Sequence, residues 1–125
     1  MKRLSLIGAA LFALVLMCGA EPATAGDYGA LATSPQADFG YSYNFDDEDG
    51  AQDRALTECQ KHSGECKIKG TFSNTCVSIA KAGNGAMGWA WGHGKSSDDR
   101  MAMTECRNNK GRDCELSARF CTGSP

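Results

Sequence analysis

Residues 87–120 read MGWAWGHGKSSDDRMAMTECRNNKGRDCELSARF, and residues 39–72 read FGYSYNFDDEDGAQDRALTECQKHSGECKIKGTF. The two stretches correspond along their whole length, with one-residue length differences on either side of the first cysteine. Matched positions include Tyr41 with Trp89, Tyr43 with Trp91, Cys59 with Cys106, Cys66 with Cys114, and Phe72 with Phe120. The chain is therefore predicted to contain two repeats, over residues 28–75 and 76–121, that bury their apolar faces together.

Each repeat shows the same succession of local patterns. The aromatic stretch alternates large and small side chains, which is the period of a β-strand, and a short apolar run before it predicts a hairpin. Acidic residues then predict a helix start, with Ser96 as a cap and Asp99 as its partner in the second repeat. A second alternating segment follows the next cysteine. The predicted class is α+β: a duplicated β-β-α-β unit, an antiparallel sheet with two short helices on one side, stabilised by disulfides.

Six of the seven cysteines lie in residues 26–125. In an exported chain of this size, six cysteines indicate three disulfides. The repeat pairs Cys59 with Cys66 and, at the matching positions, Cys106 with Cys114. Cys76 and Cys121 have no counterparts and are predicted to pair with each other.

The N-terminal segment has the layout of a secretory signal peptide. Lys2 and Arg3 precede an apolar run, and Ala23-Thr24-Ala25 provides a small-residue cleavage pattern. Residues 1–25 are therefore predicted to be removed, and residues 26–125 to form a single periplasmic or secreted domain that is monomeric and not inserted in a membrane. Lipidation at Cys18 is disfavoured, because Met17 stands where a small residue is needed.

Composition and spacing argue against several classes of function. The 13 basic and 15 acidic residues give a net charge of −2 without a basic stripe, so nucleic acid is a poor candidate partner. Glycines at 83, 85 and 88 match a dinucleotide loop, but a strand rather than a helix follows them. The acidic run at 46–49 lacks EF-hand spacing, and the cysteines are too far apart for zinc. No cofactor and no metal are expected.

The aromatic stripe is the main candidate site. Tyr41, Tyr43, Trp89, Trp91 and His93 would form it, and two alternatives stay open. Either the rings are buried as core beneath the helices, or the glycine and alanine face lies under the helices and the rings form a partly exposed binding surface. His93 continues the tryptophan face, as a solvated loop residue or as a catalytic base.

The residues also resemble a known family. YGALA at 28–32, GAMGWAWG at 85–92 and the cysteine layout of MTECRNNKGRDC at 103–114 are similar to the bacterial "domain of unknown function 4189" group of small exported proteins. The acidic NFDDEDG at 44–50 departs from the glycine and small residues common in the family. The resemblance implies export, disulfides and this architecture, and it implies no catalytic residues.

A non-enzymatic exported binding module is the function that these patterns favour. The expected partner is another protein, as for an inhibitor or an immunity-type protein, because a rigid disulfide-tied sheet without a catalytic constellation suits recognition. Two alternatives are a cell-wall or carbohydrate binder that uses exposed rings, and a small hydrolase that uses His93.

Overall fold

The computed structural model describes residues 26–125. The predicted signal peptide, residues 1–25, lies outside this described part. Within residues 26–125, no helix has both the length and the apolar character needed to cross a bilayer.

Both repeats form the same elements in the same order, which confirms the α+β class and the duplicated β-β-α-β unit. The first repeat contains β1 (Tyr28–Thr33), β2 (Phe39–Phe45), α1 (Glu48–Gln60) and β3 (Lys67–Ser73). The second contains β4 (Thr75–Lys81), β5 (Met87–Trp91), α2 (Lys95–Asn108) and β6 (Glu115–Thr122).

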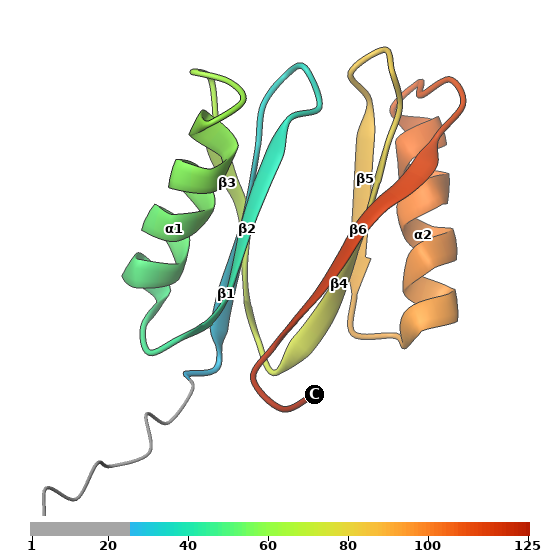
Figure 1. The fold of residues 1–125 in the computed structure, drawn as a ribbon. Coiled ribbons are helices and arrows are strands. Elements are labelled where there is room, and N and C mark those ends of the chain that lie inside the picture. Colours follow the sequence, from blue (N-terminus) through green and yellow to red (C-terminus); the bar gives the residue numbers. More distant parts are fainter. Residues whose placement is uncertain (1–25) are drawn as a thin grey trace, which may run out of the picture.

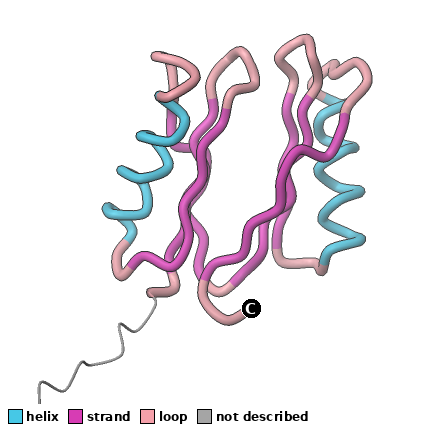
Figure 2. Tube along the Cα trace, in the orientation of Figure 1, coloured by secondary structure: helices cyan, strands magenta, loops and turns pink. Residues whose placement is uncertain are grey.

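The strands form two antiparallel sheets rather than one. Their orders are β2-β1-β3 and β5-β4-β6, so each repeat builds its own three-stranded sheet. The two sheets lie face to face in the middle of the molecule, and α1 and α2 cover their outer sides (Figure 1, Figure 2). The predicted sheet with two helices is thus present as two sheets, each with its own helix on one side. Each sheet carries apolar side chains on both faces, so a helix buries one face and the opposite sheet buries the other.

Small side chains allow each helix to approach its sheet closely. A Cβ atom added at Gly40 would collide with the backbone of α1 at Cys59, and one added at Gly88 would collide with the backbone of α2 at Ala102. Most of the buried residues between each helix and its sheet are alanines, including Ala30, Ala32, Ala51 and Ala55 in the first repeat and Ala80, Ala90 and Ala102 in the second. The small face of each aromatic strand therefore faces its helix.

Larger side chains fill the space between the two sheets. The buried residues of this central core are Leu31, Ala37, Phe72, Val77, Ile79, Met87 and Phe120, which come from both repeats. The ring of Tyr41 stacks on that of Phe120 with centroids 4.6 Å apart, which joins the first sheet to the second. Neither repeat contains this core by itself, as is typical of repeats that bury their apolar faces against each other.

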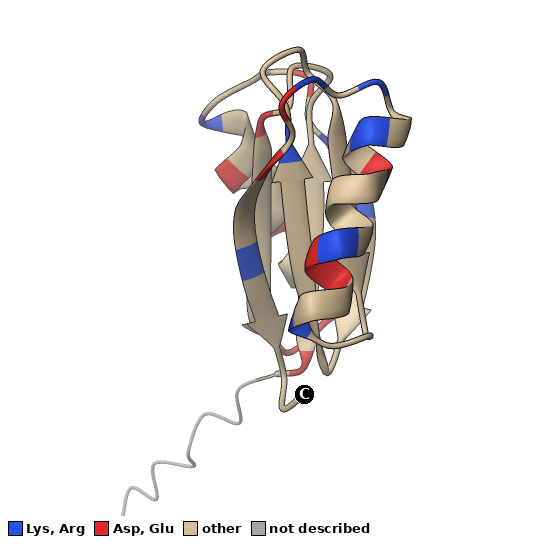
Figure 3. Ribbon diagram, turned by 90° about the vertical axis from the view of Figure 1, so that its right-hand side faces the viewer, with Lys and Arg blue, Asp and Glu red and all other residues tan. Residues whose placement is uncertain are grey.

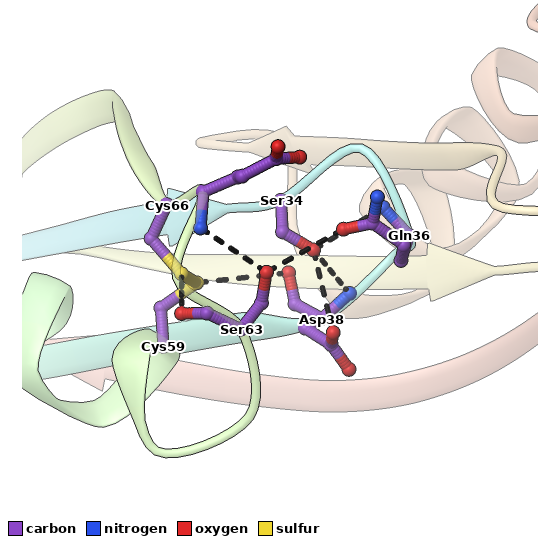
Figure 4. The surroundings of a disulfide bond; sticks show 7 residues. Ser34, Gln36, Asp38, Cys59, Ser63 and Cys66 are labelled. Carbon is purple, nitrogen blue, oxygen red and sulfur yellow. Dashed lines mark hydrogen bonds between the residues drawn. A yellow bond between two sulfur atoms is a disulfide. The ribbon is translucent and has the colours of Figure 1, made fainter.

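The three predicted disulfides are present: Cys59–Cys66 and Cys106–Cys114 at matching positions of the two repeats, and Cys76–Cys121 between the two cysteines without counterparts. Figure 4 shows the first of them beside the β1–β2 turn, where the hydroxyl of Ser34 accepts hydrogen bonds from the backbone N–H groups of Gln36 and Asp38 at 3.2 and 3.1 Å. The disulfide and this turn hold one end of the first sheet together.

The two helices begin differently. Asp47 caps α1, because its Oδ1 accepts a hydrogen bond from the N–H of Gly50 at 2.6 Å. The capping box predicted for α2 is wrong: the cap is Gly94, with φ of 85° and no side-chain hydrogen bond. Asp99 instead accepts from Ser78 of β4 at 2.6 Å and from Lys95 at 2.7 Å. A tertiary contact to the sheet has replaced the local cap.

Candidate functional site

The structure divides the four rings of the aromatic stripe into an inner and an outer pair. Tyr41 and Trp89 are partly buried and pack against the central core between the sheets. Tyr43 and Trp91 retain 53% and 46% of their surface exposed. One ring of each repeat therefore contributes to the core, and the next ring along the strand is a surface residue.

Both exposed rings lie on edge strands, next to a helix of the same repeat. In the sheet orders, β2 and β5 are outermost, with α1 and α2 packed against them. A surface groove runs between strand and helix in each repeat, with a volume of about 700 Å³ in the first and about 1080 Å³ in the second. We call them the β2–α1 groove and the β5–α2 groove.

The β5–α2 groove is the more apolar of the two. Trp91 lies on its strand side, where its ring meets the edge of Phe72 with centroids 5.1 Å apart. Met101 lies on its helix side and is 45% exposed. The side chains that line this groove include Trp89, Trp91, His93, Arg100, Met101 and Glu105. Contact with Phe72 restrains the Trp91 ring without covering it.

Charged side chains occupy the β2–α1 groove instead. Arg54 Nε lies 3.0 Å from Glu58 Oε1, and Lys61 Nζ lies 3.0 Å from the same oxygen. Arg54, Glu58 and the exposed Tyr43 line this groove together. Glu58 is therefore paired with two basic groups, Arg54 within α1 and Lys61 at its C-cap.

Glu58 and Glu105 hold the same position in the two repeats, but their environments differ. The hydrogen bond from Lys61 and the neighbouring charge of Arg54 lower the pKa of Glu58. Glu105 is an exposed residue, but partial desolvation of its carboxylate in the β5–α2 groove raises its pKa, and the approach of the Trp89 backbone N–H opposes this effect only in part. Within residues 26–125, Glu105 forms no ion pair.

The backbone of β5 also faces this groove. Asn109 Nδ2 donates a hydrogen bond to the carbonyl oxygen of Met87 at 2.7 Å, on the side away from β4. Backbone groups alternate in direction along an antiparallel strand, so those of Trp89 and Trp91 share the orientation of Met87. The groove therefore offers hydrogen-bonding groups as well as rings.

His93 lies at the end of the β5–α2 groove and is held by a buried carboxylate. Its ring Nδ1 lies 3.3 Å from Oδ1 of Asp98, and the same oxygen accepts from the His93 backbone N–H at 3.2 Å. Asp98 is 1% exposed, and its Oδ2 lies 3.8 Å from Nη1 of Arg119. Arg119 also donates to the hydroxyl of Ser78 at 2.7 Å. This cluster fixes the loop between β5 and α2.

The same cluster is absent from the first repeat. Ala30, Ala51 and Thr71 stand at the positions of Ser78, Asp98 and Arg119. Within the described part of the chain, no group of three or more His, Cys, Asp or Glu side chains could hold a metal ion. The polar cluster is thus a feature of the second repeat, and through Asp98 it contacts His93, whose side chain is 57% exposed.

In the structure, Trp89, Trp91 and His93 line the β5–α2 groove, whereas Tyr41 and Tyr43 line the β2–α1 groove. Sequence reasoning placed all five in one aromatic stripe, and they do not form one surface. It missed Met101 and Glu105. The aligned repeats contained the signal, because Met101 replaces Arg54 and therefore leaves Glu105 without the basic neighbour of Glu58.

Comparison with curated proteins and with solved structures gave no match. A family model described as "Domain of unknown function (DUF4189)" matches residues 28–121, which span both repeats from β1 to β6. The match covers every strand and both helices of the duplicated unit. The chain belongs to the DUF4189 family.

Proposed function

We propose that this protein is an exported, non-enzymatic module that binds another protein through the β5–α2 groove. The observation that carries the proposal is the pair of exposed apolar side chains, Trp91 and Met101, on opposite sides of one groove. Tryptophan and methionine are enriched at protein interfaces, and a few such residues contribute most of the binding free energy. The groove therefore has the composition of a recognition site.

The rigidity of the site supports recognition. The Trp91 ring is held against Phe72, and the loop that follows β5 is held by the buried carboxylate of Asp98. A disulfide joins Cys106, near the end of α2, to Cys114. Because these residues are ordered before binding, little conformational entropy is lost when a partner binds.

Export is part of the proposal because of the disulfides. Three disulfides in about one hundred residues persist in an oxidising compartment and are rare in the cytosol. The leader-like residues 1–25 are in keeping with this location. A periplasmic or extracellular protein is the partner that such a module would meet.

Two matched variants test the binding surface. Trp91→Ala and Tyr43→Ala each remove an exposed ring from an edge strand, one in each groove. The immobilised protein is used to capture partners from envelope extract, and its affinity for the captured protein is then measured after purification. We expect Trp91→Ala to lose capture and Tyr43→Ala to retain it. Equal loss in both variants, or binding to purified cell wall in place of protein, would contradict the proposal.

A second candidate function is hydrolysis with His93 as the general base. The contact between His93 Nδ1 and the buried Asp98 favours it, because it would orient the ring and leave Nε2 free to accept a proton from water. Hydrolysis of an activated acetate ester, measured with His93→Gln and with His62→Gln as the control, tests this function. Activity that is lost only in His93→Gln would favour the hydrolase over the binding module.

A further inference from the structure

We infer that the β5–α2 groove binds an arginine side chain of the partner protein, with its guanidinium held by Glu105 and the rings of Trp89 and Trp91. The inference rests on the proposed function and names the group that the groove recognises. It follows from a comparison of the two grooves, which the duplication makes equivalent.

The first repeat shows how its groove is filled. Arg54 of α1 extends to Glu58 one helical turn later, with Nε 3.0 Å from Oε1. This ion pair lies in the groove that Tyr41 and Tyr43 line. A guanidinium paired with a glutamate beside aromatic rings is therefore an arrangement that this fold accommodates.

The second repeat keeps the glutamate and lacks basic residues at the two positions that pair with it in the first repeat. Glu105 stands at the position of Glu58, while Met101 and Asn108 replace Arg54 and Lys61. The larger volume of the β5–α2 groove agrees with the absence of a filling side chain. A cation from outside the chain would complete the arrangement that the first repeat completes by itself.

The aromatic residues of the second repeat are of a type that binds cations more strongly than those of the first repeat. Trp89 and Trp91 replace the tyrosines at 41 and 43, and tryptophan binds cations over its face more strongly than tyrosine does. A cation paired with the Glu105 carboxylate would favour its charged form and so offset the partial desolvation that raises its pKa. Carboxylate and rings thus act on the same charge.

The carboxylate of Glu105 beside aromatic rings selects arginine, and the positions of the charged residues along the groove select an orientation for the partner segment. A planar guanidinium can pair with a carboxylate and stack on an aromatic face together, which a lysine ammonium does less well. Arg100 and His93 also line the groove, nearer the beginning of α2, while Glu105 lies nearer its end. The arginine is therefore expected to enter beside Glu105, with its own chain extending along β5.

The two tryptophans provide a direct measurement, because the chain contains only two and both lie in this groove. Their indole N–H signals are followed by NMR in the oxidised protein during titration with the blocked tripeptide acetyl-Gly-Arg-Gly-amide. A matched peptide with citrulline in place of arginine has nearly the same shape without the charge. We expect both indole signals to shift with the arginine peptide and not with the citrulline peptide. Equal shifts with both peptides, or none with either, would overturn the inference.

Three variants localise the effect. Glu105→Gln should weaken the arginine peptide about tenfold or more, as loss of a charge-assisted pair does. Glu58→Gln, at the equivalent position of the first repeat, should leave its affinity unchanged. Met101→Arg should abolish binding, because it supplies to Glu105 the cation that Arg54 supplies to Glu58. Unchanged affinity in Glu105→Gln would refute the assignment.

The failure of this inference is distinguishable from the failure of the proposed function. If partner capture is lost in Trp91→Ala but unaffected by Glu105→Gln and Met101→Arg, the groove binds a protein and the arginine assignment is wrong. If the arginine peptide binds as expected while Trp91→Ala retains partner capture, the cation site stands and the proposed function is wrong.

Discussion

Replacing Gly88 with alanine perturbs the closest approach of α2 to its sheet. A Cβ atom at this position would lie within 3.0 Å of Ala102 O, Cys106 N and Glu105 Cβ. Two of these atoms belong to the helix backbone, so no side-chain rotation relieves the collision, and α2 has to move away from β5. Overpacking of this kind costs about 1 to 3 kcal/mol.

Thermal unfolding of the oxidised protein measures that cost. For a domain of this size, each kcal/mol lowers Tm by about 4 to 8 °C. Gly83→Ala is the control, because a Cβ atom there would meet nothing within 4 Å and the change should stay within about 1 kcal/mol. If Gly88→Ala and Gly83→Ala melt at the same temperature as the parent, the small-residue contact between strand and helix does not hold the layers together.

Three further predictions concern the covalent links, the two glutamates and the leader. The loss of chain entropy on loop closure gives a stabilisation of about 4 kcal/mol for Cys76–Cys121, with a sequence separation of 45, and of about 2.4 kcal/mol for Cys59–Cys66, with a separation of 7. Denaturant unfolding of the two double alanine variants should therefore show the larger loss of stability when Cys76–Cys121 is removed. Because the pKa of Glu58 is lowered, its carboxylate stabilises the fold at pH values above the ordinary pKa of glutamate, and this stabilisation is lost as the pH falls. Glu58→Gln should therefore be less stable than the parent at neutral pH and equally stable in acid. The pKa of Glu105 is shifted in the opposite direction, so its charged carboxylate slightly destabilises the fold at neutral pH. Glu105→Gln should therefore be at least as stable as the parent at neutral pH. Intact mass of the exported protein should give Gly26 as the first residue, and a lipid-modified species that begins at Cys18 would contradict the leader assignment.

Local patterns were sufficient to predict the elements and the unit that they form. The alternation around Trp89 and Trp91 predicts a strand, and the matching positions in the first repeat show that the pattern is structural rather than incidental. The repeat also selects, among fifteen possible arrangements of six cysteines, the three disulfides that the structure contains.

The layer arrangement depends on contacts between repeats, which no local pattern encodes. The face that carries Gly88 and Ala90 lies under α2, as one of the two alternatives expected. The opposite face meets the other sheet rather than solvent, so Trp89 is partly buried while Trp91, two residues later at the sheet edge, is exposed. Whether a ring is buried or exposed depends on its position along the strand, and the two-residue alternation in the sequence does not show this.

The candidate groove was only partly predictable for a related reason. Asp98 reads in sequence as one of several acids at a helix start, whereas in the fold it is buried beneath His93 and beside Arg119. Figure 3, which views the face carrying α2, shows acidic and basic residues interspersed along the helix. Whether Glu105 has a basic partner depends on which side chains reach it in the folded protein, and the order of charges in the sequence does not show this.

Hydrogen–deuterium exchange in the presence of the purified partner tests the central claim most directly, because it reports which backbone amides the partner covers. If the β5–α2 groove is the binding surface, protection should increase in residues 87–108, including the edge amides of Trp89 and Trp91, and should remain unchanged in residues 39–60 of the equivalent groove. Protection of residues 39–60 with residues 87–108 unchanged would contradict the account.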